Sequence, residues 1–303
     1  MSLDEKANAE KISPVSSNSS SEQAQSTAYN ANTNTPSLSA LDNLQVLPKI
    51  LQEGVLFVAS GPALLLQAAH PGFSTTANTS TNLTTELTTS LHATLSYIAC
   101  LVFGTAEEKE ALLGRLRLGQ PPLQSSPSST PSSRPPASQL WLLATLYATA
   151  TDFYQRIYGS FDYRTAEAAY DEFGVVLRHL SPTILPSDQA LWPSTRAEFW
   201  KYWDAELPKL AVSAAAHDVA TELARWDLPR GVGLTRPVLR AITIEMLPEN
   251  IREGYGLKST FGTRRLYATA MGLLKPVYPC IPRGWRASPV KYYLEELRRG
   301  ISS

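Results

Sequence analysis

Four histidines are the side chains of this chain best suited to ligate a metal ion or to transfer a proton. His70, His92, His179 and His217 lie far apart in the sequence, and none belongs to an H-E-x-x-H pair. The sequence also lacks paired C-x-x-C motifs, a G-x-G-x-x-G fingerprint, a phosphate-binding loop and a G-x-S-x-G elbow. Zinc hydrolase, nucleotide-binding and serine hydrolase functions therefore have no support from motifs.

His70 and His92 each allow two interpretations. His70 precedes a proline at the end of an apolar segment, so its imidazole is expected at a helix C-terminus, where the partial negative charge favours the cation. His92 lies two residues before Thr94 on an expected helix. Each imidazole either bonds to neighbouring polar groups or faces a pocket as a ligand. His179 and His217 are expected to be ordinary helix residues.

Arg252 is a candidate for binding an acidic group. It follows a turn in the segment MLPENIREGYGL. Its guanidinium either pairs with Glu249 or Glu253 or contacts a ligand, because the planar fork suits carboxylates and propionates. The aromatic residues between Trp192 and Trp203 are expected to anchor the core and the surface rather than to form a cofactor site.

The elements that position these residues are predicted to be helices, because apolar residues recur at helical spacing and strand signals are nearly absent. Helices are expected over residues 140–158, 164–180, 210–226, 236–247 and 263–274, and after N-terminal caps at Thr105, Thr195 and Ser288. The apolar run from Val55 to Ala69 is shorter than the roughly 20 residues of a membrane span, so it predicts a buried core helix. The predicted fold class is all-α, with a single globular multi-helix domain.

Composition sets the domain boundaries and excludes some partners. Apolar residues make up 43% of the chain, and 27 basic residues balance 27 acidic ones, so no nucleic-acid surface is indicated. Residues 1–42 are predicted to be a disordered tail, residues 43–303 the domain, and residues 121–138 a flexible Pro/Ser-rich loop within it. Cys100 and Cys280 are expected to be buried free thiols. No secretory signal is visible, so secretion is not expected.

Several segments, in a fixed order, resemble a known family. They are LLLQAAHPG (residues 64–72), HATLSYIACLVFGTAEE (92–108), QLWLLATLYATATDFYQRIYG (139–159), LPSDQALWPSTRAEFWKYWDAEL (185–207) and MLPENIREGYGL (246–257). Together they resemble the catalytic domain shared by fungal ER-bound oxygenases and bacterial rubber oxygenase (latex clearing protein). The resemblance implies an all-α fold around one haem b and oxidative cleavage of isoprenoid carbon–carbon double bonds by O₂.

The sequence departs from the family's pattern at two positions near the cofactor. The family's iron-ligating histidine falls at Gln120, whose amide oxygen is a poor substitute for an imidazole. The family's arginine falls at Ser90, four residues before a threonine that is retained as Thr94. The resemblance then implies a haem site that draws on His70, His92, Thr94, Gln120 and Arg252, with His92 or His70 as the replacement metal ligand.

The sequence leaves three functions open. The first is a haem-dependent, oxygenase-like oxidoreductase that acts on an apolar, isoprenoid or lipid-like substrate. The second is a catalytically degenerate helical protein that binds an apolar small molecule, and the third is an interaction module. The expected partners are an apolar substrate and no nucleic acid. We expect no transmembrane span, peripheral membrane contact is allowed, and the expected location is the cytoplasm or the ER surface.

Overall fold

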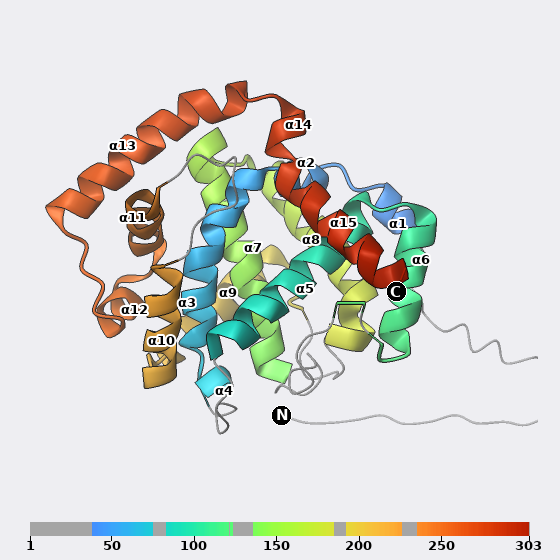
Figure 1. Cartoon of the computed structure of the whole chain (residues 1–303), viewed down its shortest axis with the longest axis horizontal. Coiled ribbons are helices and arrows are strands. Elements are labelled where there is room, and N and C mark those ends of the chain that lie inside the picture. The colour runs from blue at the N-terminus through green and yellow to red at the C-terminus, as the bar shows by residue number, and fades with distance from the viewer. Residues whose placement is uncertain are drawn as a thin grey trace, which may run out of the picture. The chain divides into compact units, whose positions relative to one another are not determined.

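The structure is a computed structural model that describes residues 38–74, 83–120, 122–123, 136–184, 192–225 and 235–302. These residues belong to one unit, Thr35–Ser303. All regular secondary structure among them is helical (Figure 1), so the all-α prediction is confirmed. The tail over residues 1–37 and most of the expected 121–138 loop lie outside the described residues.

The helices follow one another with short connections. The first part of the chain forms α1 (Ser39–Asp42), α2 (Leu47–Leu51), the 3₁₀ helix η1 (Gly54–Ala59), α3 (Ser60–Ala68), α4 (Pro71–Ser74), α5 (Leu83–Phe103), α6 (Ala106–Arg117) and α7 (Pro136–Tyr158). The second part forms α8 (Tyr163–Ile184), α9 (Arg196–Glu206), η3 (Leu207–Lys209), α10 (Ala214–Leu223), α11 (Arg236–Met246), α12 (Glu249–Gly254), α13 (Phe261–Val277), η4 (Tyr278–Cys280), α14 (Arg283–Arg286) and α15 (Ser288–Ser302).

Helix α3 lies at the centre of this unit, packed against α7, α5 and α10 (Figure 1). Three consecutive residues, Leu64, Leu65 and Leu66, are almost fully buried. A helix that is apolar on every side belongs in an interior, and this explains why the apolar run in this part of the sequence is not amphipathic. The run is buried as predicted, although it forms η1 and α3 rather than one helix. Within the described ranges, no helix combines the length and the hydropathy needed to cross a membrane.

The aromatic residues in α9 and just before it join the core, as predicted. Trp192 stacks on Tyr170 of α8, with 5.5 Å between ring centroids. Trp203 stacks on Trp141 of α7 at 4.9 Å. Phe199 is fully buried between these groups. Aromatic contacts of this kind fix α9 against both long helices.

The predicted caps begin two helices, with one difference. Thr105 and Glu108 form both bonds of a capping box at the start of α6. At the start of α9, Thr195 accepts a hydrogen bond from the Glu198 N–H, but the Glu198 carboxylate accepts from the Ser194 N–H instead. The second box is therefore only half formed.

Several predictions need correction. Helix α10 begins at Ala214 rather than Leu210, after an N-cap at Ser213, and Ser288 is the first residue of α15 rather than its N-cap. The folded part begins before residue 43, because Leu41 of α1 is buried in the core. Helix α7 begins at Pro136 rather than Leu140, since proline is tolerated in the first turn of a helix, where its missing N–H has no partner to lose. Cys280 is exposed, whereas Cys100 is buried as predicted. In the 3₁₀ helix η4, the Tyr278 side chain faces the interior of the protein. Cys280, two residues later, therefore lies on the opposite, exposed side of η4.

Candidate functional site

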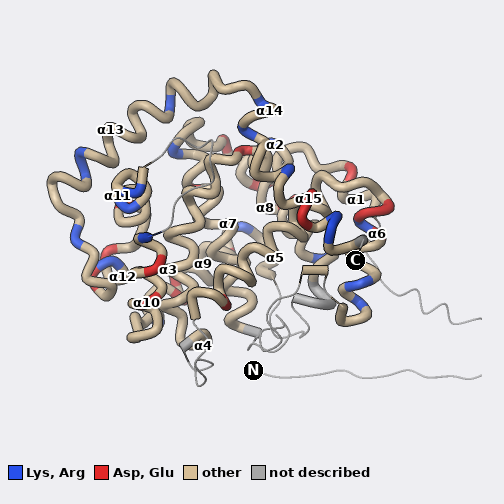
Figure 2. Tube along the Cα trace, viewed as in Figure 1, with Lys and Arg blue, Asp and Glu red and all other residues tan. Residues whose placement is uncertain are grey.

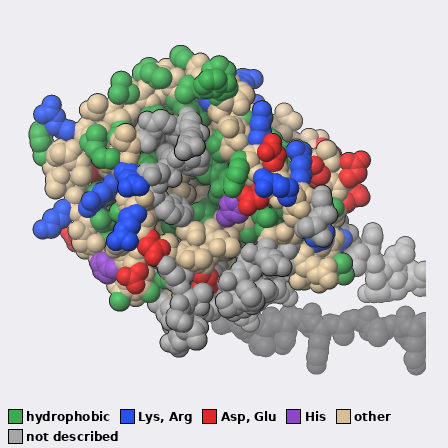
Figure 3. All heavy atoms as spheres, in the orientation of Figure 1, with side chains coloured by type: hydrophobic (Ala, Val, Ile, Leu, Met, Phe, Trp, Pro, Cys, Tyr) green, Lys and Arg blue, Asp and Glu red, His purple; other side chains and the backbone are tan. Residues whose placement is uncertain are grey.

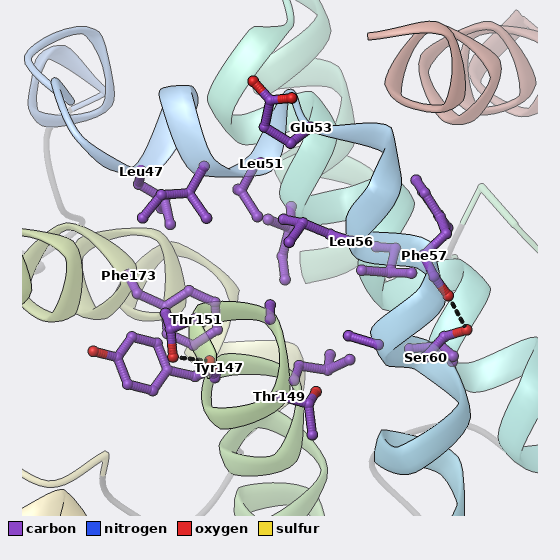
Figure 4. A pocket seen from close by; sticks show the side chains of 17 residues that line it. Leu47, Leu51, Glu53, Leu56, Phe57, Ser60, Tyr147, Thr149, Thr151 and Phe173 are labelled. Atoms are coloured by element: carbon purple, nitrogen blue, oxygen red, sulfur yellow. Dashed lines mark hydrogen bonds between the residues drawn. The ribbon is translucent and has the colours of Figure 1, made fainter. Parts of the chain in front are cut away.

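A narrow apolar pocket lies between α2, η1, α5, α7 and α8 (Figure 4). Helix α2 supplies Leu47, Ile50 and Leu51 to its lining. Helix α5 supplies Leu91, Leu95 and Ile98, whose spacing of four and then three residues places them on one face of that helix. The pocket has a volume of about 90 Å³ and is partly open to solvent.

The carboxylate of Glu172, on α8, holds the α2 wall of this pocket in place. It accepts hydrogen bonds from the backbone N–H groups of Gln45, Val46 and Leu47 at 2.7–3.1 Å. These N–H groups lie at the start of α2, where they have no partner inside the helix and where the helix dipole favours an anion. The carboxylate thereby fixes a short helix that its own hydrogen bonds would not stabilise.

Three of the four hydroxyl groups in the lining already donate a hydrogen bond within the protein, and the fourth, on Tyr147, points away from the other lining side chains (Figure 4). Thr149 donates to the Thr145 carbonyl at 2.7 Å, Thr151 to the Tyr147 carbonyl at 2.7 Å, and Ser60 to the Phe57 carbonyl at 2.6 Å. Each oxygen therefore keeps only acceptor capacity for a ligand. The pocket suits an apolar group, or a group that donates a hydrogen bond, and offers nothing to a carboxylate.

Glu53 contributes its stem to the pocket wall while its carboxylate points away (Figure 4). The carboxylate pairs with the Arg286 guanidinium of α14 through two contacts of 2.7 and 2.9 Å and accepts a hydrogen bond from the Tyr158 hydroxyl at 2.9 Å. The two charged side chains are only 5% and 11% exposed. No motif in the sequence indicated this pair, whose partners are 233 residues apart.

His70 is buried beside α7 and α9, in a structural role. Its Nδ1 accepts a hydrogen bond from the Gly72 N–H at 3.2 Å, and its ring stacks on Trp141 at 5.9 Å. Burial lowers the pKa of His70 below 6.5, although the Glu206 carboxylate 3.9 Å from Nε2 opposes this shift. Loss of hydration thus opposes the preference for the cation that the sequence predicts at a helix end.

The lowered pKa predicts a pH dependence of stability. The unfolded chain binds the proton more readily than the folded protein, so the free energy of unfolding is highest above about pH 6.5 and falls as the pH drops toward the lowered pKa. Urea unfolding at about pH 7.5 and about pH 5 should show a smaller decrease in His70→Asn than in the unsubstituted protein. His217→Asn, on the exposed side of α10, is the control. An unchanged decrease in His70→Asn would contradict this account.

His92 faces α15 and not the pocket. Its Nε2 lies 3.0 Å from Glu296 Oε2, and its ring lies against Tyr293 at 4.8 Å between centroids. Both His92 and Glu296 are about 30% exposed. The imidazole is therefore held by α15, and a further ligand could reach Nε2 only after Glu296 moves.

Gln120 is exposed at the end of α6. Gly119 adopts a positive φ of 68°, its N–H donates to the Leu116 carbonyl, and the Gln120 N–H donates to the Arg115 carbonyl at 2.9 Å. This pair of hydrogen bonds is a Schellman motif, in which glycine ends the helix without steric cost. The residue at the family's ligand position is thus part of a helix terminator on the surface.

Thr94 and Arg252 are placed apart from the pocket lining. Thr94 is buried on α5, next to Leu95, which does line the pocket. Arg252 of α12 lies 4.0 Å from Glu249, its i−3 neighbour, which favours the structural interpretation of this arginine over the ligand interpretation. The structure therefore gives the sequence-predicted residues separate surroundings rather than one shared cavity.

His179, which the sequence gave no reason to select, is the most buried candidate for accepting a further bond. Its Nδ1 contacts the Val175 carbonyl at 2.9 Å, which makes Nδ1 the protonated nitrogen. Its Nε2 is buried without a hydrogen-bond partner. No sequence signal distinguishes this histidine from an ordinary helix residue, because the distinction depends on what packs around it.

These observations do not fit a haem held as the family pattern implies. All four histidines are described, and both His70 and His92 point a ring nitrogen at a carboxylate while Gln120 faces solvent. The pocket of about 90 Å³ is smaller than the roughly 150 Å³ apolar cavity that admits benzene in an engineered protein, so it cannot hold a porphyrin. No group of three or more potential metal ligands occurs in the described part of the chain.

Comparison with known proteins identifies the family. Residues 48–275 match the catalytic domain described as ER-bound oxygenase mpaB/B′/rubber oxygenase, so the chain belongs to this family of oxygenase domains. Uncharacterized proteins of Mycobacterium bovis and Mycobacterium tuberculosis are each 28% identical to it over 127 residues, covering 41% of this chain. The chain spans about half the length of these relatives, since the match covers 48% of each. No solved structure matches the chain significantly.

The match confirms the resemblance seen in the sequence and locates the pocket within the family's domain. The lining residues, except Leu47 at its edge, fall inside residues 48–275. Helices α14 and α15 fall outside the match. The two contacts made by Arg286 and Glu296 are therefore contributed by a segment beyond the matched domain.

Proposed function

We propose that this protein is an oxygenase-type oxidoreductase whose apolar pocket binds part of a lipid-like substrate. The observation that carries the proposal is the pocket itself, which lies within the oxygenase domain and is lined almost entirely by aliphatic and aromatic side chains. Binding sites for small molecules are usually concave and mostly apolar, with few polar groups. Membership of the family supports the proposed class of reaction, and the apolar lining of the pocket supports the proposed class of substrate.

The size of the pocket limits which part of a substrate enters it. A volume of about 90 Å³ accommodates a branched group of a few carbon atoms and no more. The remainder of a longer chain, such as an isoprenoid, would lie outside the opening. Because the Ser60, Thr149 and Thr151 hydroxyls already donate within the protein, they can only accept a hydrogen bond from a ligand, and a terminal alcohol is favoured over a carbonyl or a carboxylate.

Haem b is the cofactor that family membership suggests, and in this chain it requires a ligand other than Gln120. His92 is the better of the two candidates, because rotation of the partly exposed Glu296 side chain would free its Nε2. His70 would have to lose its hydrogen bond from Gly72 and its stacking on Trp141. Thr94 and Arg252 are proposed to affect the cofactor only through the position of α5 and α12.

A second candidate function is supported by the same histidines. If both imidazoles stay paired with carboxylates, the chain is a catalytically degenerate member that binds an apolar molecule without haem. The exposed Gln120 favours this candidate, since the family's ligand position then has no role in cofactor binding.

A visible spectrum distinguishes the two candidates. The protein is expressed with a haem precursor, purified, and analysed for a Soret band and for iron content. The first candidate predicts a Soret band with about one haem iron per protein chain. The band should be lost in His92→Ala but not in His217→Ala. Adding a prenyl alcohol should then cause oxygen consumption. Gln120→His should then strengthen haem retention. A colourless, folded protein that binds prenyl alcohols would support the second candidate and contradict the first.

A further inference from the structure

The segment from Gly254 to Leu294 has an unusual charge composition. It contains seven basic residues and no Asp or Glu, whereas the whole chain has 27 of each kind. The rest of the chain therefore carries seven more acidic than basic residues. The basic residues of the segment are Lys258, Arg264, Arg265, Lys275, Arg283, Arg286 and Lys291. The net charge of the whole chain is zero, so it does not reveal this uneven distribution of basic and acidic residues.

Helices α13 and α14 of this segment expose large apolar side chains. Phe261, Leu273 and Val277 of α13 and Trp285 of α14 are 56–79% exposed. In Figure 1, α13 arches along one edge of the helical assembly and leads into α14, and Figure 3 shows apolar side chains gathered along that edge. We call these four residues with the neighbouring exposed cations the α13–α14 surface.

The opposite side of α13 already packs into the protein. Ala270 and Met271 are buried, and α13 lies against α11 and α7. The exposed apolar side chains therefore lie on the side of α13 that does not pack against the rest of the unit. Several large apolar side chains exposed along one edge, among polar and charged groups, are typical of a site of protein or membrane contact.

The cations of the α13–α14 surface are largely free to meet an external anion. Arg264, Arg265, Lys275 and Arg283 are all exposed. Figure 2 shows Lys and Arg positions, without acidic ones between them, along α13 and α14. Arg286 differs, because it turns inward to Glu53 and so anchors α14 to the pocket wall. The segment thus combines a rigid attachment on its inner side with unneutralised positive charge on its outer side.

We infer that the α13–α14 surface binds an anionic phospholipid bilayer. Exposed Trp and Phe side chains favour the interface between lipid headgroups and acyl chains, and basic residues nearby are attracted to anionic headgroups. A nucleic acid would match the cations but not Leu273 and Val277. An acidic protein surface is the other possible class of partner, and the experiment below distinguishes it from a lipid bilayer. This inference does not depend on haem or on the pocket.

Vesicle binding tests the inference directly. Full-length protein is sedimented with vesicles of phosphatidylcholine alone and with vesicles that also contain phosphatidylserine. A polarity-sensitive fluorophore on the exposed Cys280, in η4 between the two helices, reports contact. Burial raises the pKa of the Cys100 thiol to about 12, so labelling is selective for Cys280. We expect binding only to anionic vesicles, a shift of the emission to shorter wavelength, and weaker binding at high salt.

Two pairs of variants separate the apolar and the electrostatic contributions. Trp285→Ala should weaken vesicle binding by roughly tenfold or more. Its control is Leu118→Ala, which changes an equally exposed apolar residue at the end of α6. Arg264→Glu with Arg265→Glu should also weaken binding by roughly tenfold or more, whereas Arg117→Glu should not. Circular dichroism and urea unfolding verify that the variants fold.

Three results would overturn the inference. The first is no binding to anionic vesicles, and the second is equal binding to neutral and anionic vesicles. The third is vesicle binding that survives both sets of substitutions in folded protein. A specific complex with an acidic protein that is lost in Trp285→Ala, together with no vesicle binding, would assign the surface to a protein partner instead.

Discussion

Replacing Glu53 with alanine is expected to lower the free energy of unfolding by about 3–5 kcal/mol. The substitution leaves the guanidinium of Arg286, which is 11% exposed, without its carboxylate partner. Without its partner, the buried guanidinium still bears the free-energy cost of dehydration. The attraction to a carboxylate no longer offsets this cost, so the folded state is destabilised. Urea unfolding, with the slope checked for two-state behaviour, measures the difference.

An exposed ion pair provides the control for this prediction. Arg298 pairs with Glu108 at 2.6 Å but is 50% exposed, so Arg298→Ala should cost at most about 1 kcal/mol. The double variant Glu53→Leu with Arg286→Met should recover most of the loss, since both charges are removed together. A cost for Glu53→Ala as small as that of Arg298→Ala would show that water reaches the pair and that α14 is not fixed through it.

Filling the apolar pocket should strongly weaken binding of a prenyl alcohol. Ala150 lies on α7 in the pocket lining, and phenylalanine at this position would occupy the space of about 90 Å³. We expect Ala150→Phe to weaken binding by roughly tenfold or more, since a pocket this small has no room for both groups. Tyrosine and tryptophan fluorescence or isothermal calorimetry with a soluble prenyl alcohol measures the affinity.

The matched control for the pocket variant is Ala111→Phe on α6. Ala111 is also partly buried, but it does not line the pocket. Both variants must unfold at similar urea concentrations for the comparison to hold. If Ala150→Phe binds the alcohol as well as the unsubstituted protein does, the substrate site lies elsewhere and the proposed role of this pocket is wrong.

The segment beyond the family's domain connects the pocket with the α13–α14 surface. Arg286 joins α14 to Glu53, and Glu296 of α15 lies against His92 of α5. A lipid-like substrate would be encountered most readily at a membrane, so a membrane-binding surface attached to the pocket wall is consistent with the proposed substrate class. The two proposals still have separate tests, because vesicle binding requires neither haem nor an open pocket.

The sequence alone determined the fold class, the family and much of the helix pattern. These features depend on local properties: the 3.6-residue spacing of apolar side chains, the cap at Thr105, and the order of the family segments. Thr195 shows the limit of such signals, because its partner Glu198 bonds to Ser194 instead. A local motif specifies where a helix begins more reliably than it specifies every hydrogen bond.

Tertiary structure alone decided the role of each candidate site residue. Whether His70 is charged depends on its burial against Trp141, and whether His92 can accept a ligand depends on Glu296, 204 positions later in the chain. The Glu53–Arg286 pair and the α13–α14 surface likewise arise from packing between distant segments. Dehydration, pairing and exposure are properties of the surroundings of a side chain, and the surroundings exist only once the helices have packed.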